Sequence, residues 1–144
     1  MIYFDSDVLV HYFVGYLPAQ HTESKGYIER AMQNGLFYVS QLSMQELAHA
    51  MGKLNQPAPL VEEAISILKA NSPINYDLSH FDRAMQLAAF TGFSSINDCL
   101  HTAIAESQKC TEIITYNRKQ FDIIKFKTKL KVTILKAPET SAPQ

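Results

Sequence analysis

This 144-residue sequence has few glycines and few cysteines, and it has no long apolar run. Its five glycines form no loop of the type that holds a nucleotide phosphate, which argues against a P-loop protein. Its two cysteines, Cys99 and Cys110, show no CxxC or Cys/His ligand spacing. We interpret them as reduced, packed thiols, because two cysteines alone make a poor disulfide framework.

Signals for a membrane or for secretion are missing as well. No stretch approaches the roughly 18 apolar residues of a membrane span, and the acidic residues Asp5 and Asp7 make the first segment unlike a signal peptide. The serines show no pattern with His and Asp that would identify a hydrolase triad. The sequence therefore predicts a cytoplasmic protein with no membrane contact.

Short apolar runs alternate with longer helical patterns along most of the chain. This α/β alternation predicts a three-layer α/β/α sandwich around a mostly parallel sheet. The length suits one domain, which we assign to residues 1–136, followed by a flexible C-terminal tail at 137–144. The predicted strands are residues 1–4, 36–39, 74–76, 113–116 and 132–135, and the predicted helices include 8–14, 42–54, 60–70, 79–90 and 97–108.

Four polar residues stand at predicted strand ends or helix starts: Asp5, Glu46, Asp98 and Asn117. Helices that join parallel strands run antiparallel to them and begin at the carboxyl edge of the sheet. Asp5 and Asn117 directly follow strands, whereas Glu46 and Asp98 come early in helices. We therefore expect all four residues on one rim.

Helix capping is the alternative explanation for each of these residues. The segments Ser43–Glu46 and Ser95–Asp98 both have the form of a capping box, and Asp5 or Ser6 is placed to cap the helix after the first strand. Three carboxylates on one rim, however, repel each other unless a cation neutralises them. Oxygen ligands of this kind favour a hard divalent cation, Mg²⁺ or Mn²⁺.

At these residues the chain resembles the PIN-domain nucleases, and its small size is similar to that of the VapC-type toxins of bacterial toxin–antitoxin pairs. The resemblance extends from about Ile2 to Leu135. Two departures stand out, since Asp7 replaces a usual Asn and Asn117 replaces a fourth acid found in many members. The matching segments are Asp5-Ser6-Asp7-Val8, Val39-Ser40 with Glu46-Leu47, Ile96-Asn97-Asp98, and Thr115-Tyr116-Asn117 with Phe121.

The resemblance implies a PIN-like fold and a Mg²⁺- or Mn²⁺-dependent endoribonuclease. Asp5 and Asp98 are then expected to bind the metal directly or through water, and Glu46 to hold a metal-bound water and accept its proton. Asn117 is expected to orient water or complete the shell. The implied partners are an RNA substrate, a cognate antitoxin and a second copy of the chain, and the accessory site residues are Ser6, Asp7 and Thr115.

Two other functions remain open at this point. One is a PIN-like RNA-binding or scaffold protein with weak or no nuclease activity, because Asn117 takes the place of an acid. The other is a DNA-processing nuclease on the same fold. An assay of metal-dependent RNA cleavage separates an endoribonuclease from the binding or scaffold protein. Competition between RNA and DNA substrates separates it from the DNA-processing nuclease.

Positive charge is concentrated near the end of the chain. Residues 1–112 carry 12 acidic and 6 basic side chains, whereas residues 113–144 carry 2 acidic and 7 basic ones. Candidate contacts to RNA phosphates are Arg118, Lys119, Lys125 and Lys127. The alternative is a solvated face that protects an edge strand, since a period of two places four lysines on one side of an extended segment: Lys125, Lys127, Lys129 and Lys131.

A histidine and three aromatic residues have more than one interpretation. His101 lies three residues after Asp98 on the same helix face, so it either contacts a substrate or is an ordinary surface or packed histidine. Tyr12, Phe13 and Tyr16 belong to the core, to a dimer face or to a groove for an antitoxin peptide, and the core is favoured for Phe13.

Overall fold

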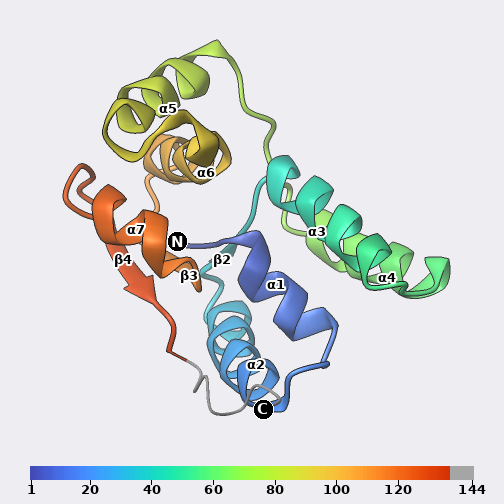
Figure 1. Cartoon of the computed structure of the whole chain (residues 1–144). Coiled ribbons are helices and arrows are strands. Elements are labelled where there is room, and N and C mark those ends of the chain that lie inside the picture. Colours follow the sequence, from blue (N-terminus) through green and yellow to red (C-terminus); the bar gives the residue numbers. More distant parts are fainter. Residues whose placement is uncertain (137–144) are drawn as a thin grey trace.

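The computed structural model describes residues 1–136, so the predicted tail at residues 137–144 lies outside the described residues. Helices cover both faces of a small central sheet (Figure 1). The elements in chain order are β1 (Ile2–Phe4), α1 (Ser6–Phe13), α2 (Pro18–Gln33), β2 (Phe37–Tyr38), α3 (Gln41–Lys53), α4 (Ala58–Lys69), α5 (Leu78–Thr91), the 3-10 helix η1 (Phe93–Ser95), α6 (Ile96–Ser107), β3 (Glu112–Thr115), α7 (Arg118–Ile124) and β4 (Lys131–Ile134).

The four strands are parallel and lie in the order β2-β1-β3-β4. Tyr3 of β1 pairs in register with Tyr38 of β2 on one side and Ile113 of β3 on the other. This arrangement confirms the predicted α/β fold with a parallel sheet. The chain leaves β1 toward β2 but later returns to the opposite side of β1 as β3. Ligands of such sheets bind at the carboxyl ends of the strands on either side of this switch point.

Alternate side chains of the strands face two separate hydrophobic cores. Tyr3 and Ile113 pack with buried residues of α5, α6 and α7. Phe4 and Ile114 point to the other face and pack with buried residues of α1, α2, α3 and α4. Because side chains of a strand alternate between faces, adjacent residues of β1 and of β3 serve different cores. The result is the expected three-layer arrangement.

The predicted helix caps are partly confirmed, since Asp5 caps α1. Ser40 caps α3, because its Oγ accepts from the backbone N–H of Ser43 while Ser43 Oγ accepts from the N–H of Ser40. The predicted capping boxes at Ser43–Glu46 and Ser95–Asp98 are wrong. Ser95 makes no capping hydrogen bond, because the short turn of η1 precedes α6 directly.

Three segments differ from the sequence prediction, and one of them is α7, where no helix was predicted. Residues 74–76 form no strand, because the Ile74 carbonyl accepts from the N–H of Gln41 at the start of α3 rather than from a neighbouring strand. The 16-residue helix α2 was not predicted. Its only buried side chains are Ser24, Ile28 and Ala31, so its apolar stripe is weak.

Residues 1–136 include no helix whose length and apolar character would let it cross a membrane.

Of the three aromatic residues near α1, Phe13 packs partly buried against the core, which confirms the favoured interpretation. Tyr12 is partly buried against the same core, whereas Tyr16 is 51% exposed and stacks on His11.

Candidate metal centre

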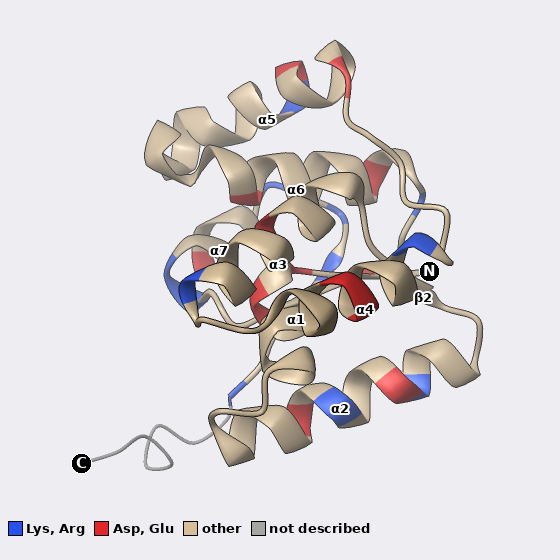
Figure 2. Ribbon diagram, turned by 90° about the vertical axis from the view of Figure 1, so that its right-hand side faces the viewer, with Lys and Arg blue, Asp and Glu red and all other residues tan. Residues whose placement is uncertain are grey.

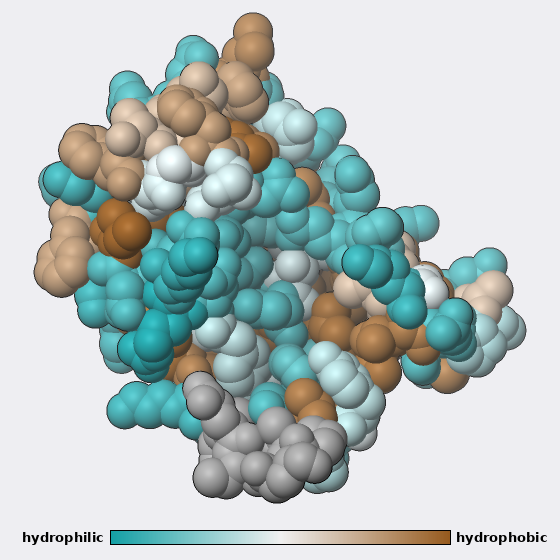
Figure 3. Space-filling view, in the orientation of Figure 1, coloured by the Kyte–Doolittle hydropathy of each residue, from teal (hydrophilic) through white to brown (hydrophobic). Residues whose placement is uncertain are grey.

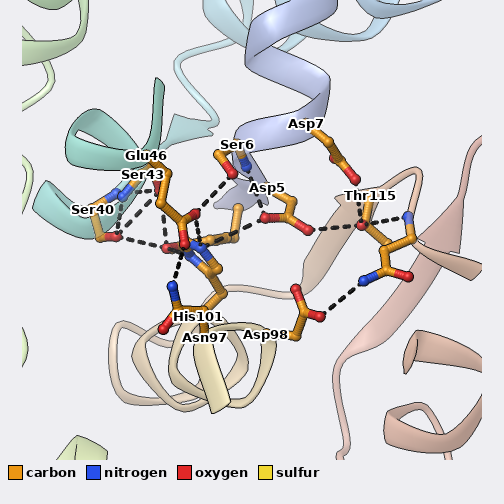
Figure 4. Close-up of polar contacts among 12 residues, drawn as sticks. Asp5, Ser6, Asp7, Ser40, Ser43, Glu46, Asn97, Asp98, His101 and Thr115 are labelled. Carbon is orange, nitrogen blue, oxygen red and sulfur yellow. Dashed lines mark hydrogen bonds and ion pairs between the residues drawn. The ribbon is translucent and has the colours of Figure 1, made fainter. Parts of the chain in front are cut away.

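The four predicted site residues lie at the carboxyl edge of the sheet. Asp5 directly follows β1 and Asn117 follows β3, the two strands at the switch point, while Glu46 comes from the second turn of α3 and Asp98 from the first turn of α6. Figure 4 shows Asp5, Glu46 and Asp98 directed toward one another from these separate elements. The connection rule for parallel sheets therefore placed them correctly.

Asp5 is the most deeply buried of these carboxylates, with 4% of its surface exposed. The backbone N–H of Ser6 donates to Oδ1 at 2.8 Å, and Thr115 Oγ1 donates to Oδ2 at 2.8 Å. The first bond also makes Asp5 the cap of α1. Asp5 therefore caps α1 and belongs to the site at the same time.

Glu46 is held by three donors from two elements, α1 and α6. Oε1 accepts from Ser6 Oγ at 2.8 Å and from His101 Nε2 at 2.6 Å, while Oε2 accepts from Asn97 Nδ2 at 2.8 Å. Burial alone would raise the pKa of Glu46, but the bonds from His101, Ser6 and Asn97 outweigh it and lower the pKa below its ordinary value. Glu46 is therefore ionised at neutral pH.

Asp98 lies beside Asn117, on the opposite side of Asp5 from Glu46 (Figure 4). Asn117 Nδ2 donates to Asp98 Oδ2 at 2.9 Å, and Asn117 Oδ1 accepts from the N–H of Gln120 as the cap of α7. Burial, followed by the charge of Asp5, raises the pKa of Asp98 to about 7. The charge of His101 and the bond from Asn117 lower this pKa, but they do not outweigh burial and the charge of Asp5.

The three predicted accessory residues all take part in this network. Ser6 joins Asp5 to Glu46 through its N–H and its hydroxyl. Thr115 Oγ1 lies 2.8 Å from Asp5 Oδ2 and 3.4 Å from Asp7 Oδ2. Asp7 also accepts from the N–H of Tyr116, yet burial and the charge of Asp5 raise the pKa of Asp7 well above its ordinary value.

His101 is the site residue whose position the sequence left undecided. It is 1% exposed, so the packed interpretation is confirmed and the substrate contact is wrong, but the residue packs inside the site itself. Its Nε2 lies 2.6 Å from Glu46 Oε1 and 3.6 Å from Asp5 Oδ1. Burial opposes a charge on the ring, but Tyr3, Glu46 and Asp5 together raise the pKa of His101 well above its ordinary value.

Comparison with protein-family models matches residues 2–127 to the PIN domain. This chain belongs to the PIN-domain family. A comparison with curated proteins gave no match. PIN domains are generally nucleases and typically bind a divalent metal ion, so the carboxylate edge is the place to look for both properties in this chain.

The residues of this PIN domain suit a divalent cation. Within residues 1–136, no Lys or Arg forms an ion pair with Asp5, Asp7, Glu46 or Asp98. His101 offsets part of this negative charge, since it pairs with Asp5 and Glu46. Burial and the charge of Asp5 nevertheless raise the pKa values of Asp98 and Asp7. The compact group of candidate ligand atoms, all within 4.8 Å of one another, comes from Asp5, Glu46 and His101, and Asp98 lies outside it.

The lysine-rich segment at residues 118–131 differs in part from the sequence prediction. Figure 2 shows basic positions in blue on α7, whose sequence contains Arg118 and Lys119. Residues 125–130 form a turn and bends, so the predicted extended row of lysines is wrong. Lys125 ends α7 and pairs with Asp122 at 3.0 Å. Lys127 Nζ lies 4.0 Å from the ring centroid of Phe90, which is 59% exposed. Cations and an open aromatic ring thus share one surface.

A cavity of about 790 Å³ lies at the other edge of the sheet. Its lining includes Cys110, which precedes β3, and Leu130, which precedes β4. Of its charged lining residues, Arg83 and Glu106 pair with each other at 2.8 Å, and Lys127 and Lys129 add positive charge. The cavity is separate from the carboxylate edge, because none of Asp5, Glu46 and Asp98 lines it.

Proposed function

We propose that this PIN domain is a Mg²⁺- or Mn²⁺-dependent endoribonuclease and the toxin of a VapC-type toxin–antitoxin pair. The convergence of Asp5, Glu46 and Asp98 at the switch point carries the metal-dependent chemistry. The preference for RNA and the role as a toxin rest on the sequence resemblance described above. Such a protein acts in the cytoplasm, where cellular RNA is found.

In this proposal Asp5, Asp98 and Glu46 would hold the cation, which when bound would supply an activated water and stabilise the charge that develops on phosphate. Each protein group has a distinct part. Ser6 and Thr115 fix the two oxygens of Asp5. Glu46 is ionised and so accepts a proton from the attacking water. The amide of Asn117 orients Asp98.

A cleavage assay on a panel of structured RNAs tests the proposal. We expect products only with Mg²⁺ or Mn²⁺, and their loss when a chelator removes the metal. A DNA strand of the same sequence is the competitor, and it should neither be cut nor slow RNA cleavage. RNA binding without cleavage in either metal would instead support a PIN-like RNA-binding or scaffold protein, the alternative that Asn117 favours.

Restoring an acid at position 117 is expected to tighten metal binding. In the Asn117→Asp variant a carboxylate oxygen replaces the amide donor that lies 2.9 Å from Asp98 Oδ2. The added negative charge should raise Mg²⁺ affinity by about tenfold, or ~1.4 kcal/mol. Calorimetric titration gives the affinity, and Asn34→Asp, at an exposed position after α2, is the control. Equal affinities in both variants would place residue 117 outside the metal site.

The lysines near α7 are expected to hold the RNA strand. Each phosphate contact contributes roughly −0.7 to the logarithmic salt slope of single-strand binding. The double variant Lys125→Ala with Lys127→Ala should therefore weaken binding and flatten the slope by up to about 1.4. Fluorescence anisotropy at several salt concentrations measures the RNA affinity and its salt slope. The control is the double variant Lys53→Ala with Lys69→Ala, which removes two exposed lysines from α3 and α4. An unaltered salt slope in the Lys125/Lys127 variant would assign those two lysines to a solvated face.

The partners in this proposal are a cognate antitoxin and a second copy of the chain. Figure 3 shows a hydrophilic central region between apolar patches. Leu78 of α5 and Leu60 of α4 are exposed apolar side chains. An antitoxin segment with a basic side chain near Asp5 and Asp98 would compete with the cation. Coexpression with a short neighbouring reading frame should give a complex in which cleavage is blocked.

A further inference from the structure

A chain of buried polar side chains lies beneath the carboxylates. Tyr3 Oη is 2.6 Å from His101 Nδ1, and His101 Nε2 is 2.6 Å from Glu46 Oε1. Tyr3 is 0% exposed and His101 is 1% exposed. The bond between Tyr3 and His101 is therefore closed to water, so these two groups depend on each other. The bond between His101 and Glu46 is partly buried, because 23% of the Glu46 side chain is exposed. We call this set the Tyr3–His101–Glu46 chain.

The Tyr3–His101–Glu46 chain connects three elements that form the site. Tyr3 belongs to β1, His101 to α6 and Glu46 to α3. The start of α3 is attached to the same tyrosine, because Tyr3 Oη also lies 2.7 Å from Ser40 Oγ and 3.1 Å from Ser43 Oγ. The bonds thus fix α3 and α6 against the central strand at the level of the carboxylates.

The direction of the bond to Glu46 follows from its chemistry. An ionised carboxylate has no proton to donate, so His101 Nε2 carries the proton and donates it to Oε1. Ser6 Oγ donates to the same oxygen, and Asn97 Nδ2 donates to Oε2. Ser6 is half-buried and Asn97 is exposed, whereas His101 is buried. The histidine is therefore the donor least able to move away.

We propose that His101 is a positioning residue of the PIN site, which holds the Glu46 carboxylate in place for the cation and is itself oriented by Tyr3. The role of Glu46 toward a cation rests on the proposed function. Direct ligation by His101 is the competing arrangement, since its Nε2 belongs to the compact group with Asp5 and Glu46. The 2.6 Å bond to Oε1 opposes it, because a nitrogen that carries a proton has no free electron pair for a metal.

The test compares His101→Leu, which removes the donor, with His101→Gln, whose side-chain amide keeps a donor near Nε2. We expect His101→Leu to weaken Mg²⁺ and Mn²⁺ binding by about 10- to 100-fold, the usual effect of losing a partner of a metal ligand. His101→Gln should keep affinity within a few-fold of the wild type. Tyr3→Phe, which removes only the hydroxyl that orients the ring, should give an intermediate loss.

The control is His80→Leu, which alters another buried histidine. His80 Nε2 bonds Ser107 Oγ at 2.8 Å, between α5 and α6 and away from the carboxylates. We expect this variant to unfold at a lower temperature with unchanged metal affinity. Thermal unfolding in the presence of a chelator, beside calorimetry, therefore separates a loss of folding from a loss of positioning. A crystal structure of His101→Leu should show Glu46 displaced from its position near Ser6.

Three results would overturn the inference. The first is wild-type affinity for both metals in His101→Leu. The second is an equal loss in His101→Gln and His101→Leu, which would make His101 a direct ligand. The third is a wild-type protein that binds neither metal. Failure of the proposed function is a different result, namely metal binding without RNA cleavage in the wild type, and the calorimetric comparison remains decisive in that case.

Discussion

Replacing Asp98 with Asn is expected to reduce RNA cleavage by about 10²-fold or more, similar to the loss of one group that stabilises developing charge. The change removes one negative charge from the carboxylate edge. The fold should remain intact, because an amide oxygen at position 98 can still accept from Asn117 Nδ2, as Asp98 Oδ2 does at 2.9 Å. Cleavage rates under saturating Mg²⁺, together with the unfolding temperature, measure the two expectations.

The matched control is Asp82→Asn, on an exposed position of α5. It changes the net charge by the same amount and should leave the cleavage rate within about twofold, as expected of a surface change away from special features. A folded Asp98→Asn protein with the wild-type rate would remove Asp98 from the proposed mechanism.

Truncating Phe121 to Ala is expected to lower the free energy of unfolding by about 3–5 kcal/mol, the usual cost of removing a large buried aromatic side chain. Phe121 is 0% exposed and packs α7 into the core that also contains Tyr3 and Ile113. Urea denaturation measures the change. Because Asn117 caps α7, the folded fraction should also bind metal less tightly if α7 shifts.

Ile123→Ala provides the comparison within the same helix. Ile123 is 41% exposed, so its truncation should cost less than about 1 kcal/mol. Similar losses from the two substitutions would mean that α7 is not anchored through Phe121, contrary to the packing described above.

The outcome for capping illustrates how local and distant interactions combine in one residue. The sequence presented capping and catalysis as alternatives for Asp5, but in the structure this residue caps α1 with one oxygen and accepts from Thr115 with the other. Asn117 likewise caps α7 with its carbonyl oxygen and donates to Asp98 with its amide. A carboxylate or carboxamide has several hydrogen-bonding sites, so both descriptions hold.

The errors in the prediction arose where local pattern had no support from distant contacts. Residues 74–76 have a strand-like pattern, but the Ile74 carbonyl is used by Gln41 at the start of α3. The lysines at 125, 127, 129 and 131 have a period of two, but residues 126–130 turn to connect α7 with β4. Period alone does not show whether a ladder partner exists.

The sequence by itself determined the α/β class, the parallel sheet and the common edge for Asp5, Glu46, Asp98 and Asn117. These features follow from strand and helix alternation and from the handed, short connections of parallel sheets, which depend on order along the chain. Only the tertiary structure decided the place of His101. Its partners Tyr3 and Glu46 are 98 and 55 residues away in sequence, so no local spacing could indicate which atoms would meet its two nitrogens.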